Sequence, residues 1–135
     1  MPFSKLLLSY VLTFIVFIVI DLTWIGFLAK DLYKNQLGKF LSGDVNWPAA
    51  IIFYLLFIVG IFVFVILPAL EKDSLKTVLV MGALFGLITY ATYDLTNLAT
   101  VKDWPVKIVV IDMLWGASLT CMVSVAGFFI CKWLR

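Results

Sequence analysis

The chain of 135 residues contains no histidine. This absence rules out imidazole as a general base, a haem ligand or a metal ligand, so Ser-His-Asp triads and His-rich metal sites are excluded. The two cysteines, Cys121 and Cys131, lie on one predicted helix and are separated by roughly 15 Å along its axis. Because a disulfide needs Cα atoms within about 7 Å, both cysteines are predicted to be small apolar packing residues.

Charged residues are also scarce. They make up 13% of the chain, whereas 64% is hydrophobic and the mean hydropathy is +1.15. A soluble domain has about 25% charged residues, so this composition excludes a soluble domain, a disordered tail and a nucleic-acid binder, and leaves a protein whose partner is the lipid bilayer. The sequence has no CxxC motif, no glycine-rich phosphate loop and no GxSxG elbow, so no cofactor and no metal are predicted.

Four long apolar segments are present, at about residues 5–29, 48–70, 76–98 and 105–131. Each is long enough to cross a bilayer as a helix, which takes about 20 mostly apolar residues. The segments are too long and continuous for barrel strands. We therefore predict one all-α domain over residues 1–135, an integral membrane four-helix bundle. The long first segment contains Asp21 and Trp24, which favours a retained helix over a signal peptide.

The linker at residues 30–47 is open to two interpretations. Its apolar residues lie near one helical face, which is typical of an amphipathic helix at the membrane surface; they are Leu32, Leu37, Phe40 and Leu41. A solvated loop fits the same residues equally well. The later linkers, at residues 71–75 and 99–104, are tight and predict antiparallel neighbours.

Two pairs of similar strings favour an internal repeat. The second and fourth segments each begin with a capping residue, an interfacial tryptophan and a proline, as Asn46-Trp47-Pro48 and Asp103-Trp104-Pro105. The first and third segments share the strings Asp21-Leu22-Thr23 and Asp94-Leu95-Thr96. These matches predict a duplicated helical hairpin in a parallel repeat, and the alternative is coincidence in a sequence of low diversity.

The basic residues do not fix the orientation. Half of them lie at the end that carries both termini, here called the terminal end: Lys5, Lys72, Lys76, Lys132 and Arg135. The other half lie at the opposite end, here called the distal end: Lys30, Lys34, Lys39, Lys102 and Lys107. Because the two ends carry equal numbers of basic residues, the positive-inside rule favours neither orientation. Only the terminal amine favours cytoplasmic termini, and insertion in both orientations stays open.

Three aspartates fall at one depth in three different segments. At 1.5 Å per residue, Asp21, Asp94 and Asp112 each lie roughly 10–13 Å inside the distal end. An acid costs up to about 2.5–3.5 kcal/mol at the bilayer centre, so all three are expected to point into the bundle. Trp24 and Trp115 each follow an acid by one helical turn, and Tyr90 and Asn97 flank the third. The predicted binding residues are Asp21, Asp94, Asp112, Trp24, Tyr90, Asn97 and Trp115.

Three clustered acids without a basic partner cannot all be ionised at low cost. They can be protonated in a closed structural network with Tyr90, Asn97, both indoles, Thr23 and Thr96. Alternatively, a cation from outside neutralises them, with the indoles as aromatic walls. The glycines at 82, 86 and 116 form small-xxx-small patterns that predict close helix packing. The second segment has no ionisable residue within it and is predicted to serve as structural support.

These motifs resemble a known family. The strings that carry the resemblance are Asp21-Leu22-Thr23-Trp24, Tyr93 to Thr100, Lys102-Asp103-Trp104-Pro105, and Asp112 with Trp115-Gly116. Together with the four-span layout, they resemble small bacterial predicted membrane proteins that are catalogued as a domain of unknown function. The resemblance implies a bacterial inner-membrane protein and supplies no reaction, substrate or catalytic residue.

Three functions compete at this point. The layered acids favour a small proton- or cation-coupled transporter, which would need a homodimer because four short helices enclose little volume. Two of the acids could instead act as acid and base, or hold a divalent metal, in an enzyme that modifies a lipid or isoprenoid. The third alternative is a non-catalytic assembly subunit in which the acids specify a partner.

Overall fold

The computed structural model describes residues 1–41 and 43–135, which form helices and turns and contain no strand. The first span is α1 (Phe3–Thr23) continued by a π-helical turn (Trp24–Leu28), and the second is α3 (Trp47–Ile61), a π-helical turn (Phe62–Ile66) and α4 (Leu67–Lys72). The third and fourth spans are α5 (Leu75–Thr100) and α6 (Val106–Leu134). All four are long and apolar enough to cross a membrane. The prediction of an all-α membrane bundle is confirmed.

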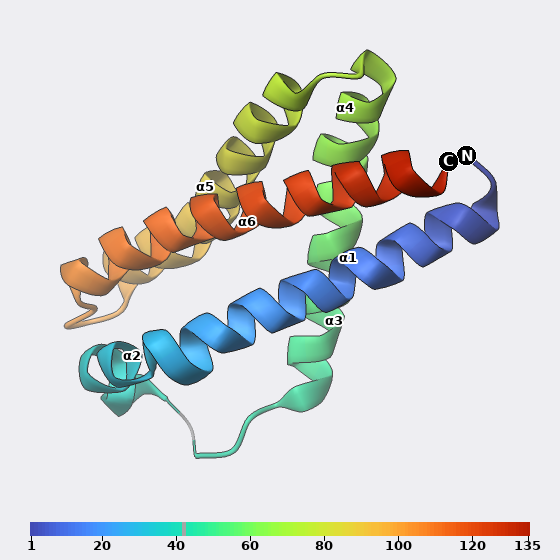
Figure 1. The fold of residues 1–135 in the computed structure, drawn as a ribbon. Coiled ribbons are helices and arrows are strands. Elements are labelled where there is room, and N and C mark those ends of the chain that lie inside the picture. Colours follow the sequence, from blue (N-terminus) through green and yellow to red (C-terminus); the bar gives the residue numbers. More distant parts are fainter. Residues whose placement is uncertain (42) are drawn as a thin grey trace.

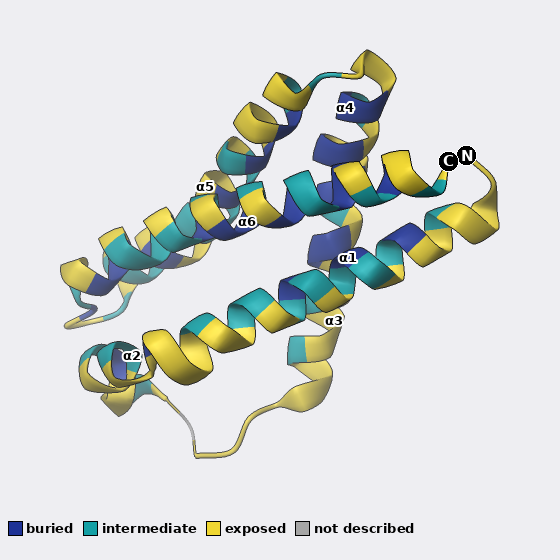
Figure 2. Ribbon diagram, viewed as in Figure 1, coloured by how far each residue is buried: buried dark blue, intermediate teal, exposed yellow. Residues whose placement is uncertain are grey.

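The spans are arranged around α6. Figure 1 shows α5 and α1 on either side of α6, while α3 and α4 run across behind them. The main core joins the second half of this crossing span to α1 and α6, and includes Phe17, Ile58, Ile61, Ile66 and Phe128. Figure 2 shows α4 with a buried face and the first half of α3 exposed. The second span is therefore held at the terminal end and diverges from its neighbours at the distal end.

Glycines bring α5 and α6 into close contact. A Cβ atom on Gly86 would lie 2.2 Å from the backbone oxygen of Gly116, and one on Gly116 would lie 2.1 Å from Cγ of Tyr90. At Gly82 the nearest atoms, on Ser124, would be 3.1 Å away. A Cβ atom would clash at Gly86 and Gly116 and would be tight at Gly82, so the small-residue patterns act in helix packing.

The first linker is a helix rather than a loop. Residues Lys30–Leu37 form α2, which continues as a 3-10 turn at Gly38–Phe40. Leu37 is buried against the start of α6, and Leu32 and Phe40 pack around it. Leu41, which shares the predicted apolar face, is instead exposed. The amphipathic-helix interpretation is thus the right one up to Phe40.

The two proline-containing helix starts are not alike. Asn46 caps α3 as predicted, because its side chain accepts a hydrogen bond from Ala49 N at 3.2 Å. At α6 the cap position is Pro105 and no side chain bonds to it. Trp47 is 61% exposed, which suits an interfacial residue, but Trp104 is only 8% exposed. The interfacial prediction for Trp104 is wrong because Phe40 and Leu37 cover its ring.

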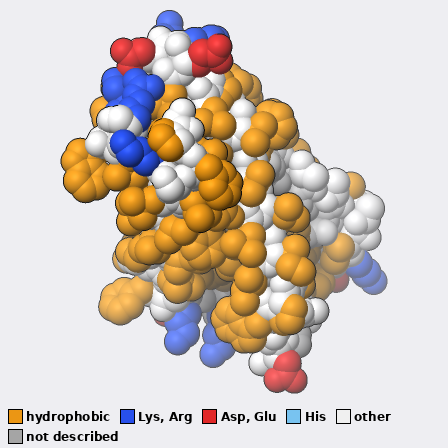
Figure 3. Space-filling model, turned by 90° about the vertical axis from the view of Figure 1, so that its right-hand side faces the viewer, with side chains coloured by type: hydrophobic (Ala, Val, Ile, Leu, Met, Phe, Trp, Pro, Cys, Tyr) orange, Lys and Arg blue, Asp and Glu red, His pale blue; other side chains and the backbone are white. Residues whose placement is uncertain are grey.

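The two halves of the chain also differ in packing. In the second half, α5 and α6 are in contact along the glycine positions. In the first half, α1 and α3 separate toward the distal end (Figure 1). The outer surface is apolar, and Figure 3 shows hydrophobic side chains across the middle of one face with charged side chains toward its ends. This distribution matches a bilayer between two aqueous layers.

Candidate functional site

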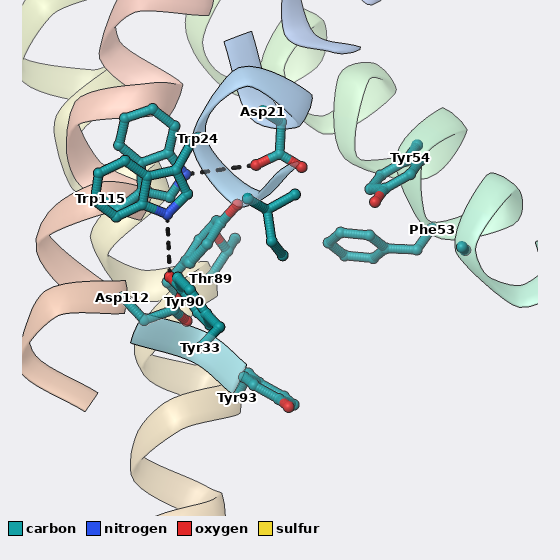
Figure 4. A pocket seen from close by; sticks show the side chains of 12 residues that line it. Asp21, Trp24, Tyr33, Phe53, Tyr54, Thr89, Tyr90, Tyr93, Asp112 and Trp115 are labelled. Carbon is teal, nitrogen blue, oxygen red and sulfur yellow. Dashed lines mark hydrogen bonds between the residues drawn. The ribbon is translucent and has the colours of Figure 1, made fainter. Parts of the chain in front are cut away.

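A pocket of about 450 Å³ fills the space between the distal halves of the spans and α2. It is lined by Asp21, Trp24, Ile25, Tyr33, Ala50, Phe53, Tyr54, Thr89, Tyr90, Tyr93, Asp112 and Trp115. Seven of these twelve residues are aromatic, two are acidic and none is basic. In Figure 4, Phe53 and Tyr54 on α3 face the stacked tryptophans across the pocket. The pocket is therefore both aromatic and acidic.

The innermost acids form a pair. Asp94 on α5 is 1% exposed, and its carboxyl group is hydrogen-bonded to that of Asp112 on α6. Oδ2 of Asp94 is buried and receives no hydrogen from any N–H or O–H donor in the described chain. An ionised carboxylate only accepts hydrogen bonds. A hydrogen bond between the two groups therefore requires that one of them carry a proton.

Tyr33 connects α2 to this acid pair. Its hydroxyl donates to Oδ1 of Asp112 at 2.6 Å and accepts from Nε1 of Trp24 at 3.2 Å. Burial, followed by the hydrogen bond to Asp112 and its charge, raises the pKa of Tyr33 well above its ordinary value. The hydroxyl therefore remains a donor, and it marks Asp112 as the member of the pair that is stabilised as an anion.

Two stacked indoles stand beside the acids. The rings of Trp24 on α1 and Trp115 on α6 are parallel to within 10°, with centroids 4.3 Å apart. Nε1 of Trp115 donates to Oδ1 of Asp21 at 3.5 Å, and Trp24 bonds to Tyr33 (Figure 4). On the far side of the stack is a second, smaller hollow lined by the same two tryptophans with Ile111, Leu114 and Ser118. The indole stack thus separates two spaces and aims one N–H group at an acid.

The structure brings the three predicted acids together, with Asp112 in the middle. Asp112 interacts electrostatically with both Asp21 and Asp94. Tyr90 lines the pocket and packs on Gly116. Within the described residues, no group of three or more acids and cysteines is arranged to hold a metal ion. Carboxyl groups brought together in this way can share a proton or lie beside a cation.

Three residues of the predicted network lie elsewhere. Asn97 is one turn beyond the acids, outside the pocket lining, and is hydrogen-bonded to Tyr93. Thr23 and Thr96 are exposed and donate to backbone oxygens of their own helices, Val19 and Thr92. The predicted closed network is therefore wrong in including these two threonines, because each is satisfied within its own helix.

Sequence reasoning missed the residues from α2 and α3. The second span was predicted to be structural support only, but Ala50, Phe53 and Tyr54 form one wall of the pocket. Tyr54 carries the one hydroxyl in an otherwise apolar run from Pro48 to Leu70, and this was an available signal. For Tyr33 no signal existed, because its contact with Asp112 joins residues 79 positions apart.

Comparisons with known proteins give one match. No curated protein and no solved structure matches the chain. One family model, described as "Predicted membrane protein (DUF2177)", matches residues 6–129. That range includes all three aspartates, both stacked tryptophans and every residue that lines the pocket. The chain therefore belongs to this DUF2177 family of predicted membrane proteins of unknown function.

Proposed function

We propose that the chain is a small membrane carrier that binds an organic cation in the pocket and couples its movement to a proton. The observation that carries this proposal is the hydrogen-bonded pair of Asp94 and Asp112 beside an aromatic pocket without basic residues. The pair supplies a proton that can be exchanged, and the pocket supplies the place for the exchanging cation.

The pocket has the chemistry of a cation site. Aromatic ring faces attract cations by about 0.5–2 kcal/mol each, most strongly where water is excluded. Asp21 and Asp112 add two carboxyl groups to the lining, and each is negatively charged when it is ionised. Such acids within a membrane span are costly unless they have a function or a partner. A bound cation provides that partner.

Coupling follows from the shared position of the two ions. A cation next to Asp112 favours the state in which both Asp94 and Asp112 are ionised, so the proton that links them is released. Conversely, a proton on the pair removes the charge that attracts the cation. Because this linkage is reciprocal, each ion displaces the other, and the carrier exchanges them.

The location and assembly are part of the same proposal. We place the chain in a bacterial inner membrane with both termini in the cytoplasm. The membrane is supported by the family resemblance. The orientation is supported by the positive charge of the terminal amine, because the basic side chains are divided equally between the two ends. Fusion of a cytoplasmic and a periplasmic reporter to each terminus tests the orientation. We also expect a homodimer, since four short helices enclose little volume, and cross-linking in native membranes tests this.

Proton movement in proteoliposomes tests the function. With a pH-sensitive dye inside, we expect an outward gradient of tetramethylammonium, tetraphenylphosphonium or dodecyltrimethylammonium to drive proton uptake. Asp94→Asn and Asp112→Asn should abolish the signal, whereas Asp31→Asn, which changes an exposed acid on α2, should retain it. If no cation moves protons, and the two inner variants alter only thermal stability, the acids are a structural network and the proposal is wrong.

A further inference from the structure

The pocket opens to the side of the bundle. Its exposed lining residues include one from each of three spans: Ile25 on the π-helical turn after α1, Phe53 on α3 and Tyr93 on α5, at 45%, 50% and 54% exposure. These three residues are here called the mouth. Figure 4 shows Phe53 set apart from the ribbons that carry the acids, with the pocket between them.

The mouth lies at the level of the lipid. Ile25 is three residues before the end of the first span at Leu28, and Phe53 is six residues after the second begins at Trp47. Tyr93 is seven residues before the third span ends at Thr100. At 1.5 Å per residue, these positions are roughly 5–11 Å inside the ends of the helices. This depth corresponds to the boundary between lipid headgroups and acyl chains.

The distal end, by contrast, is closed to water. Leu37 of α2, Trp104, Ile108 and Val109 form a buried cluster, each less than 9% exposed. Ile108 and Val109 precede Asp112 by about one turn of α6, so this cluster separates the acid pair from the aqueous end. Tyr33 adds a direct bond from α2 to Asp112.

We propose that the ligand is a cationic amphiphile that enters the pocket sideways from the bilayer, with its ammonium head among the acids and its alkyl chain leaving through the mouth. This inference rests on the proposed cation-binding function and adds the ligand's class and its route. A small hydrophilic cation would arrive from water, and α2 blocks that side. A neutral lipid would leave the two acids of the lining, Asp21 and Asp112, without a counter-charge.

The dimensions and chemistry of the pocket suit this ligand. A volume of about 450 Å³ lies within the range of about 300–1,000 Å³ of small-molecule sites. It exceeds what a trimethylammonium head needs, and so leaves room for the first part of a chain. The Trp24–Trp115 stack lines the pocket together with Tyr90 and Asp21, and this is where we expect the head to lie. Phe53 at the mouth offers an apolar surface to the chain.

Equilibrium binding in nanodiscs of phosphatidylcholine tests the proposal. The probe is labelled dodecyltrimethylammonium, corrected for its uptake by empty nanodiscs. Two competitors carry the same head as the probe. The first, tetramethylammonium, has no chain. The second has trimethylammonium at both ends of a twelve-carbon chain, so binding in the proposed way would place its second charge in the lipid. We expect saturable binding of the probe, and displacement by either competitor only at concentrations at least about 100-fold higher, a difference that corresponds to about 2.7 kcal/mol.

Matched variants test the route. Ala50 lines the pocket, and the adjacent Ala49 is exposed on the outside of α3. We expect Ala50→Trp to weaken probe binding at least tenfold and Ala49→Trp to leave it unchanged. If Ala50→Trp fails to fold, the pair Ala50→Leu and Ala49→Leu makes the same comparison, with a smaller loss. Equal binding by both members of a pair, or competitors as effective as the probe, would overturn the proposal.

The outcomes separate this inference from the proposed function. If the probe binds as expected but never drives proton movement in proteoliposomes, the carrier function is wrong and the amphiphile site stands. If tetramethylammonium drives proton movement through the Ala50→Trp variant as well as through the unaltered chain, the carrier stands and the lateral route is wrong.

Discussion

Replacing Tyr33 by phenylalanine tests the contact on which the distal closure and the acid pair both depend. The change removes a hydroxyl that donates to Asp112 at 2.6 Å and accepts from Trp24 at 3.2 Å. A hydrogen bond to a charged group contributes about 1.5–3 kcal/mol, and a neutral one contributes about 0.5–1.5 kcal/mol. We therefore expect Tyr33→Phe to lower the free energy of unfolding by about 2–4.5 kcal/mol.

The assay is a double-mutant cycle of Tyr33→Phe with Asp112→Ala, measured by equilibrium unfolding in mixed micelles. The expected coupling is about 1.5–3 kcal/mol, because the cycle isolates the charge-assisted bond. Tyr10→Phe is the matched control: its hydroxyl donates to the backbone oxygen of Leu55 at 2.8 Å, so its loss should cost only about 0.5–1.5 kcal/mol. A coupling below about 0.5 kcal/mol would refute the role of Tyr33 as a donor to an ionised Asp112.

Two further predictions concern the scaffold. Gly86→Ala would place a Cβ atom 2.2 Å from the backbone of Gly116, so it should cost about 1–3 kcal/mol or more in the same unfolding assay, whereas Gly26→Ala, with no atom within 4 Å, should cost nothing. The second prediction concerns the exposed ion pair in which Lys132 donates to Asp73 at 2.6 Å and lowers the pKa of Asp73. Because the folded pKa is below the unfolded one, the stabilisation is present above the unfolded pKa and is lost as the pH falls through the folded pKa. The variant Asp73→Asn suits the left-handed backbone at this position (φ 49°). It should be less stable than the parent chain at neutral pH and equally stable in strong acid. A difference in stability that persists in acid would contradict this.

Helical rise alone was enough to predict where the acids lie. Counting residues from the nearest lysine or proline puts Asp21, Asp94 and Asp112 at one depth. The count holds because α5 and α6 are regular helices over that distance, and the π-helical turn at Trp24–Leu28 does not change the depth of Asp21 enough to separate it from the other two. The same counting placed the spans to within a few residues of their ends. Depth and span length depend on one helix at a time, which is why the sequence is sufficient for them.

The pocket depends on how helices are rotated and tilted, and the sequence says little about either for α3. That helix is apolar on all sides, so no polar face indicates which residues point inward. Its divergence from α1 at the distal end, which places Phe53 and Tyr54 on the pocket wall, is set by the packing of Phe57 and later residues. A uniform apolar run predicts a span and leaves its orientation open.

The short helix α2 links the closure of the distal end to the state of the acids. Its apolar face covers Trp104, and on the same helix Tyr33 bonds to Asp112. Any opening that lets water from the distal end reach the acid pair must move α2, and so must also break the bond that stabilises Asp112 as an anion. Within the proposed carrier, protonation of the pair and opening toward water would then be one event, while the lateral mouth serves the amphiphile. Exchange then depends on the acid pair, where the proton and the cation exclude each other whichever route each one takes.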